Sequence, residues 1–146
     1  MTKPKLKPRK QVAALAVRND EAGQVRVMLM TSRETKRLVV PKGWPMKDRS
    51  DYSAAETEAM QEAGVVGHVH RKPIGSYDYW KRLADHFVFC RVKVFLLEVE
   101  RQLTTWKERD QRQIDWFEID EAADLVDEPG MSAIIRELLK RLKSPS

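Results

Sequence analysis

Two glutamates four residues apart, Glu58 and Glu62, lie on one face of a predicted helix. If both were simply exposed, like charges at this spacing would repel each other by roughly 0.2–0.5 kcal/mol. A divalent cation would reverse that sign, because hard ions such as Mg²⁺ are bound by one or two carboxylates together with phosphate oxygens. A solvated acidic face is the alternative interpretation. The metal interpretation is favoured by the glycine-containing segment PKGW and the basic residues directly upstream.

Basic residues gather between positions 33 and 49, against only two acidic residues in the same segment. The basic members are Arg33, Lys36, Arg37, Lys42, Lys47 and Arg49. With a formal net charge of +5 and a pI near 9.4, this pattern favours anionic partners such as phosphates. Nucleic acid also fits the charge, but the opening segment MTKPKLKPRK is typical of a solvated flexible tail over residues 1–8.

The helix that carries the glutamates has recognisable ends. Ser53 to Glu56, SAAE, fits a capping box at its start, and Gly64 fits the left-handed residue that ends a helix. Small side chains on another stripe predict close packing on a sheet. They belong to Tyr52, Ala55, Ala59 and Ala63.

The flanking elements alternate between strands and helices. Residues 11–17 and 25–33 predict a hairpin, residues 37–41 a short extended piece, residues 65–80 and 86–100 strands joined by residues 81–85, and residues 113–119 a further strand. A short helix is expected over 121–126 and a longer one over 131–143. The longer helix has an apolar stripe for packing on the sheet: Ile134, Ile135, Leu138, Leu139 and Leu142.

Length and composition predict one compact domain. The chain has 146 residues, 42% of them hydrophobic and 34% charged. The single cysteine, Cys90, lies in an apolar run and is expected to be a buried thiol in a reducing cytoplasm. No apolar stretch approaches the roughly 20 residues needed to cross a bilayer, and the start lacks the apolar core of a secretory signal. We therefore expect a cytoplasmic protein without a membrane partner.

The segment from Gly43 to Val65 resembles the signature of the Nudix hydrolases, G-x5-E-x7-R-E-U-x-E-E-x-G-U, where U is a bulky apolar residue. Gly43 matches the first glycine, Glu58 and Glu62 the first and last helix glutamates, and Gly64 the final glycine. Three positions depart from the pattern: Arg49 replaces a glutamate, Thr57 an arginine and Gln61 a glutamate. The segments RKQVAALAVR, VMLMTSR, LVVPKGW and DWFEI resemble the diphosphoinositol polyphosphate phosphohydrolase branch and its bacterial relatives, over roughly residues 9–140.

This resemblance implies an α/β fold: an α/β/α sandwich around a mixed sheet, formed by residues 9–143, with the signature as a loop-helix-loop that holds metal. The implied activity is cleavage of a P–O–P bridge with Mg²⁺ or Mn²⁺. The substrate classes left open are nucleoside diphosphate derivatives, dinucleoside polyphosphates and inositol pyrophosphates. An alternative is a catalytically impaired domain that binds a phosphorylated ligand or RNA without turnover.

The resemblance also implies roles for single residues. Glu58 and Glu62 are the expected catalytic residues, and they would hold metal together with Gln61 and the Lys42 carbonyl. Gly43 would let the backbone turn beside the ion. The substrate would contact Lys42, Gly43 and four further positions, for which an exposed basic or polar residue is the alternative. These four are Lys10, Ser32, Arg33 and Arg112.

The departures carry their own expectations. Gln61 keeps an oxygen ligand but removes a charge, so metal affinity is expected to fall. Arg49 and Thr57 cannot reproduce the salt bridge that the family's loop glutamate and helix arginine form, so packing by Trp44 and Met46 is expected to hold the loop. Two acids before the last strand, Glu108 and Asp110, are expected to be exposed, with an additional site carboxylate as the alternative.

Two further motifs lie outside the signature. His68 and His70 face the same side of a strand and, with His86, fit a metal set; ordinary surface histidines are the alternative. The aromatic residues of SYDYW could stack a base, but are more typical of a core edge. They are Tyr77, Tyr79 and Trp80.

Overall fold

A computed structural model describes residues 7–143, and the predicted tail at positions 1–8 lies outside this part as far as residue 6. The strands are β1 (Arg9–Asn19), β2 (Val25–Thr31), β3 (Leu38–Val39), β4 (Lys42–Gly43), β5 (Val65–Val69), β6 (Gly75–Arg82), β7 (Phe87–Gln102) and β8 (Ile114–Glu118). The helices are α1 (Asp51–Ala63), α2 (Ile119–Leu125) and α3 (Pro129–Lys143), with a 3-10 turn at Arg109–Gln111.

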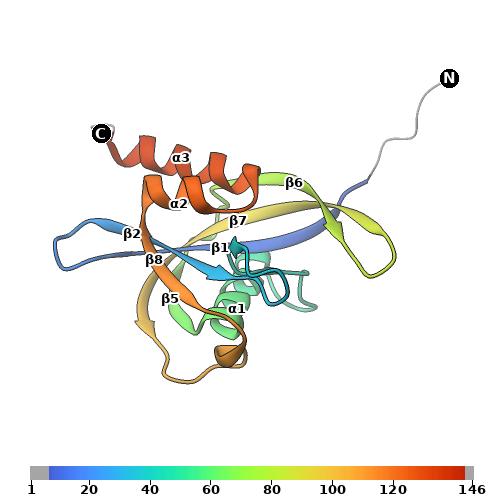
Figure 1. The fold of residues 1–146 in the computed structure, drawn as a ribbon, viewed down its shortest axis with the longest axis horizontal. Coiled ribbons are helices and arrows are strands. Elements are labelled where there is room, and N and C mark those ends of the chain that lie inside the picture. Colours follow the sequence, from blue (N-terminus) through green and yellow to red (C-terminus); the bar gives the residue numbers. More distant parts are fainter. Residues whose placement is uncertain (1–6, 144–146) are drawn as a thin grey trace.

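The sheet is mixed and lies between two helical layers. Its central path runs β3-β2-β1-β7-β5, while β4 pairs with β1, β6 with β7 and β8 with β2. Only β1 and β7 run parallel among the strand pairs of residues 7–143. Figure 1 shows α1 on one side of the sheet and α2 with α3 on the other, which confirms the predicted α/β/α sandwich.

The central strand β1 is buried on both faces. Val12, Ala14 and Ala16 pack in the core that α1 covers. Ala13 and Leu15 pack in the core that α2 and α3 cover. A strand covered on both faces needs apolar residues at successive positions, which explains the continuous run AALAV in the sequence.

The predicted order of strands and helices is confirmed, and three local predictions are wrong. Residues 65–80 form two strands, β5 and β6, with residues 70–74 between them. Strand β6 continues to Arg82, so the turn to β7 occupies residues 83–86, closed by a hydrogen bond from the Leu83 amide to the His86 carbonyl. Helix α1 begins at Asp51 after the N-cap Ser50, without a side-chain cap. Ser53 therefore lies inside the helix instead of capping it. Gly64 ends the helix with φ of 67°, as predicted.

The long helix α3 covers its face of the sheet with the predicted stripe. Ile135 is fully buried, and Ile134, Leu138 and Leu139 pack against the same core. Leu142, at the far end, is 53% exposed. Within residues 7–143 no helix combines the length and the hydropathy that crossing a bilayer requires.

Candidate active site

Small side chains bring α1 close to the sheet. Ala55, Ala59 and Ala63 are fully buried in the core beneath the helix. The adjacent face of the helix consequently lies against β4, where the Lys42 amide donates a hydrogen bond to Glu62 Oε1 at 3.2 Å. Glu62 is only 7% exposed and Glu58 is partly buried. The helix thus places both signature glutamates beside the backbone of one short strand.

Gly43 makes room for Glu58. A Cβ atom at position 43 would lie 2.4 Å from Glu58 Oε1, far inside contact distance. The φ angle of Gly43 is not positive, whereas those of Gly23 and Gly64 are. Gly43 instead lies in β4, paired with Val12 of β1, so the expected backbone turn does not occur there, and close approach of a carboxylate is the physical reason for a residue without a side chain.

Glu108 is a third acid of this site. Its side chain is 14% exposed, its amide donates to the Gln61 carbonyl at 3.0 Å, and its Oε1 accepts from Arg112 Nε at 2.9 Å. The Glu108 charge raises the pKa of both Glu58 and Glu62. The expectation of an exposed loop acid is wrong for Glu108 and confirmed for Asp110. In the sequence, the position of Glu108 four residues before Arg112 was the only indication that these two side chains could pair.

Glu58 and Glu62 hold protons more tightly than exposed carboxyl groups do. Burial raises the pKa of Glu62 to about 8, with Arg112 opposing the shift and Glu58 adding to it. Burial also raises the pKa of Glu58. Neighbouring carboxylates are costly to ionise without a cation, and oxygen donors are what Mg²⁺ and Mn²⁺ prefer. The donor set therefore fits a hard divalent ion.

Two of the predicted substrate residues adjoin the acids. Arg112 is only 10% exposed and donates to the Thr31 carbonyl at 3.2 Å, which fixes it at the end of β2. Arg33 donates to Gln111 Oε1 at 3.2 Å and has its Nε 3.9 Å from Glu108 Oε1. Both guanidinium groups therefore lie next to Glu108.

The other predicted substrate side chains are engaged elsewhere. Ser32 Oγ lies 2.7 Å from Thr35 Oγ1 and accepts from the Arg37 amide at 2.9 Å, so it shapes the β2–β3 loop. Lys10 pairs with Asp51 in the first turn of α1, about 10 Å along the helix from Glu58. Lys42 Nζ pairs with Glu128 on the side of the sheet covered by α3. The structure does not bring these three side chains to the acids.

A hydrogen bond between Arg49 and Thr57 links the signature loop to α1. Arg49 donates from Nη1 to Thr57 Oγ1 at 2.6 Å, and Thr57 Oγ1 donates to the Ser53 carbonyl at 3.0 Å. As expected, Arg49 and Thr57 do not form a salt bridge, but they are joined by a hydrogen bond in which a neutral acceptor takes the place of a charged partner. The predicted packing is confirmed for Met46, which packs against the core beneath α1, whereas the Trp44 ring lies beneath the Arg9 guanidinium at 4.5 Å.

The predicted histidine set is only partly correct. His68 and His70 lie together, but their third neighbour is Glu98. His86 lies in the turn between β6 and β7, where it pairs with Asp85. Of the aromatic residues, Tyr77 is buried in the core and Tyr79 packs against it, whereas Trp80 is 54% exposed.

The fold is shared with solved structures. The crystal structure of a C. elegans Ap4A hydrolase binary complex matches with a TM-score of 0.68 at 17% identity, covering 92% of this chain and 97% of that chain. At this identity the likeness concerns the fold alone.

The sequence comparisons define the family. The NUDIX domain model matches residues 8–141. Nudix hydrolase 13, mitochondrial, from Arabidopsis thaliana is 30% identical over 127 residues, which are 83% of this chain and 63% of that protein. Diphosphoinositol polyphosphate phosphohydrolase 2 from Rattus norvegicus is 27% identical over 137 residues, 92% of this chain and 71% of that protein. The chain belongs to the Nudix family, and these named relatives are hydrolases. It spans less than two thirds of the length of the Arabidopsis relative.

Proposed function

We propose that this protein is a metal-dependent pyrophosphohydrolase that cleaves a P–O–P bridge in a phosphate-rich small molecule. The observation that carries the proposal is the cluster of Glu58, Glu62 and Glu108, partly or fully buried and flanked by Arg33 and Arg112. Acids and arginines at one place suit a reaction that needs both bound cations and bound phosphate. Nudix proteins generally use divalent metals.

The acids of the site would bind metal and activate water, and the arginines would bind phosphate. Glu58 and Glu62 hold Mg²⁺ or Mn²⁺, with Gln61 and the Lys42 carbonyl as further oxygen donors. The bound ion supplies charge neutralisation and a more acidic water. Glu58 is placed to orient or deprotonate the attacking water, and Glu108, which pairs with Arg112, is a second candidate for this role. Arg33 and Arg112 bind phosphate oxygens, as planar guanidinium groups do well.

The substrate class follows from charge and from the relatives' names. Ap4A and diphosphoinositol polyphosphates, named for the relatives above, are both rich in phosphate. Ser32, Lys10 and the Lys42 side chain reach the substrate only if they exchange their present partners, so their predicted contacts depend on rearrangement. Gly43 contributes space for Glu58. The cytoplasmic location stays a prediction, since the Arabidopsis relative is named as mitochondrial.

A substrate screen tests the proposal. Ap4A, ADP-ribose, a nucleotide sugar and a diphosphoinositol polyphosphate would each be incubated with the protein and Mg²⁺ or Mn²⁺, and products would be identified by mass. We expect turnover of at least one compound, abolished in Glu62→Gln. Saturable binding without turnover at millimolar metal would instead support the alternative, a catalytically impaired domain that binds a phosphorylated ligand; the same titration with RNA would test its other form.

A further inference from the structure

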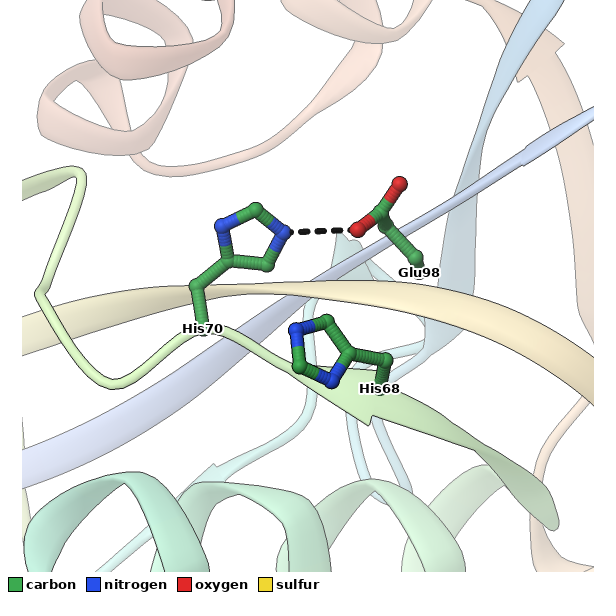
Figure 2. Close-up of side chains that lie close together, drawn as sticks. All are labelled: His68, His70 and Glu98. Atoms are coloured by element: carbon green, nitrogen blue, oxygen red, sulfur yellow. Dashed lines mark hydrogen bonds and ion pairs between the residues drawn. The ribbon is translucent and has the colours of Figure 1, made fainter.

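His68, His70 and Glu98 form a second group of metal-ligating side chains. Their candidate ligand atoms all lie within 4.8 Å of one another, and one hydrogen bond of 2.8 Å joins His70 Nε2 to Glu98 Oε2. Figure 2 shows the two imidazole rings and the carboxylate converging on one region beside β5 and β7. The ring centroids of the histidines are 5.3 Å apart.

The strand register explains why these three residues meet. His68 on β5 is the direct antiparallel partner of Glu98 on β7. His70 follows His68 by two positions and therefore points to the same face of the sheet. Side chains of such cross-strand partners are neighbours, with Cβ atoms about 5 Å apart. The backbone, rather than a flexible loop, sets the spacing of the group.

The group lies on the opposite face of the sheet from the acids. The adjacent pair in the register, Val69 and Leu97, packs in the core beneath α1. His68, His70 and Glu98 alternate with that pair and so face the side that α3 covers. The sheet thus separates them from Glu58 and Glu62, which belong to α1. An ion bound here would be distinct from the one proposed for hydrolysis.

The donor types point to a different metal from the one at the acids. Two imidazoles and one carboxylate are a ligand set for zinc sites that keep a fourth position open, whereas Mg²⁺ takes oxygen ligands. The hydrogen bond between His70 and Glu98 leaves His68 unexplained, because within residues 7–143 the His68 side chain has only the ring contact with His70. We propose that His68, His70 and Glu98 bind one transition-metal ion, with Zn²⁺ as the expected occupant.

Solvent can reach the proposed site. Glu98 lines a pocket of about 250 Å³ together with Leu138 and Leu142 of α3. His68 is exposed, and the side chain of His70 is 41% exposed. An ion can therefore enter without opening the core, and its fourth position can carry water.

A metal ion bound here would link the edge strand β5 to its neighbour β7. β5 is the last strand of the central sheet path, it begins directly after the end of α1, and its pairing with β7 shifts register between Val66 and Gly67. An ion held by His68, His70 and Glu98 joins β5 to β7 next to that irregularity. Because the unfolded chain does not present the three ligands together, zinc should raise the melting temperature.

The binding experiment uses the full chain carrying Glu58→Gln and Glu62→Gln, which removes both glutamates proposed to hold metal at the active site. After treatment with a chelator and its removal, Zn²⁺ is titrated by calorimetry, and Co²⁺ is followed by visible absorption. We expect one equivalent of Zn²⁺. Adding His68→Ala, His70→Ala or Glu98→Gln should weaken binding at least about tenfold, the lower end of what removing a metal's outer partners costs. His86→Ala is the matched control and should bind as its parent does.

The same variants, again in the chain carrying Glu58→Gln and Glu62→Gln, are compared by thermal melting. Zn²⁺ should raise the melting temperature of this parent chain and of its His86→Ala variant, but not of its His70→Ala variant; circular dichroism checks that each variant is folded. The proposed site would be overturned if the chain carrying Glu58→Gln and Glu62→Gln did not bind one equivalent of Zn²⁺. Equal Zn²⁺ affinity of the His68→Ala and His86→Ala variants would also overturn it. Neither result bears on hydrolysis, which is measured separately with Mg²⁺ or Mn²⁺.

Discussion

The two faces of the sheet are covered by helices of different kinds. Beneath α1 the buried helical residues include Ala55, Ala59 and Ala63, whereas α3 buries Met131 and Ile135. Helix-to-sheet distance depends on the side chains between them, so an alanine face lets α1 approach closely. The acidic face of α1, with Glu58 and Glu62, therefore lies against the β4 backbone. The opposite face of the sheet, which α3 covers with larger side chains, stabilises the fold. A catalytic site is thus proposed where packing is tightest.

The largest expected effect comes from the most buried acid. Glu62→Gln preserves shape but removes the charge that Lys42 N and Arg112 face. We expect kcat/KM to fall at least about 100-fold, since even outer-shell changes at metal sites cost 10–100-fold. Steady-state kinetics over a metal series measures it. Activity within a few-fold of the unmodified enzyme would remove Glu62 from the mechanism.

Gly43→Ala tests the close approach directly. The added methyl would overlap Glu58, whose Oε1 would lie 2.4 Å away, so the carboxylate must move. We expect at least about tenfold loss of kcat/KM, because small displacements of positioned groups are costly in active sites. Gly23→Ala is the control: a Cβ there meets no atom within 4 Å, although its φ of 82° adds backbone strain. Equal activity of Gly43→Ala and the parent would contradict the steric role.

Packing on the two faces should respond differently to substitution. Ala59→Leu adds volume beneath α1 at a fully buried position and should cost about 1–3 kcal/mol of unfolding free energy while lowering activity. Ile135→Val beneath α3 should cost about 0.5–1.5 kcal/mol and leave kcat/KM unchanged. Urea unfolding and kinetics on both variants provide the comparison. If Ile135→Val impaired catalysis as much as Ala59→Leu did, the division between the faces would be wrong.

The sequence predicted the parts of this architecture that have a periodic or spacing signal. The alanine stripe of α1, Gly64 at its end and the buried run of β1 were all predictable, because period and helix-end chemistry are local. The contact of Glu108 with Gln61 and that of Glu98 with His68 were not predictable, since each depends on strand or loop register across tens of residues. Glu98 joins the histidines only through its pairing with His68.

Errors at single residues had the same origin. Ser53 matches a capping box, yet the helix starts two residues before it, because a local pattern competes with alternative starts. The signature departures at Arg49 and Thr57 indicated a lost brace when each was considered alone. In the structure they contact each other, so the two departures compensate.

Proton binding by Glu62 gives a pH test of its burial. Its pKa is raised from 4.5 to about 8, so without metal the folded protein holds this proton more tightly than the unfolded chain. The stabilisation is complete below pH 4.5 and is lost as pH rises through 8, on the order of a few kcal/mol. Chelator-treated Glu62→Gln cannot lose it and should become relatively more stable from pH 5 to 8.5. Denaturant unfolding across this range measures the difference, and parallel curves would show that Glu62 titrates normally.

The smallest expected effect concerns substrate choice at Arg33, which lies at the exposed rim of the acid cluster with its side chain 59% exposed. Attraction between close charges in water is only about 1 kcal/mol, so one contact discriminates weakly and several are required for a polyphosphate. Arg33→Ala should raise KM a few-fold for a tetraphosphate-bridged or multiply phosphorylated substrate, and less for a nucleotide sugar.

The Arg33→Ala effect should be larger at low salt, where screening is weakest. KM for both substrates at two ionic strengths would measure this, with Lys36→Ala, from the same loop, as the exposed basic control. Equal losses for the two substrates, or a preference of the unmodified enzyme for the nucleotide sugar, would show that Arg33 belongs to a solvated surface. The choice of substrate would then be made on the buried side of the site, where Arg112 is fixed by Glu108 and the Thr31 carbonyl.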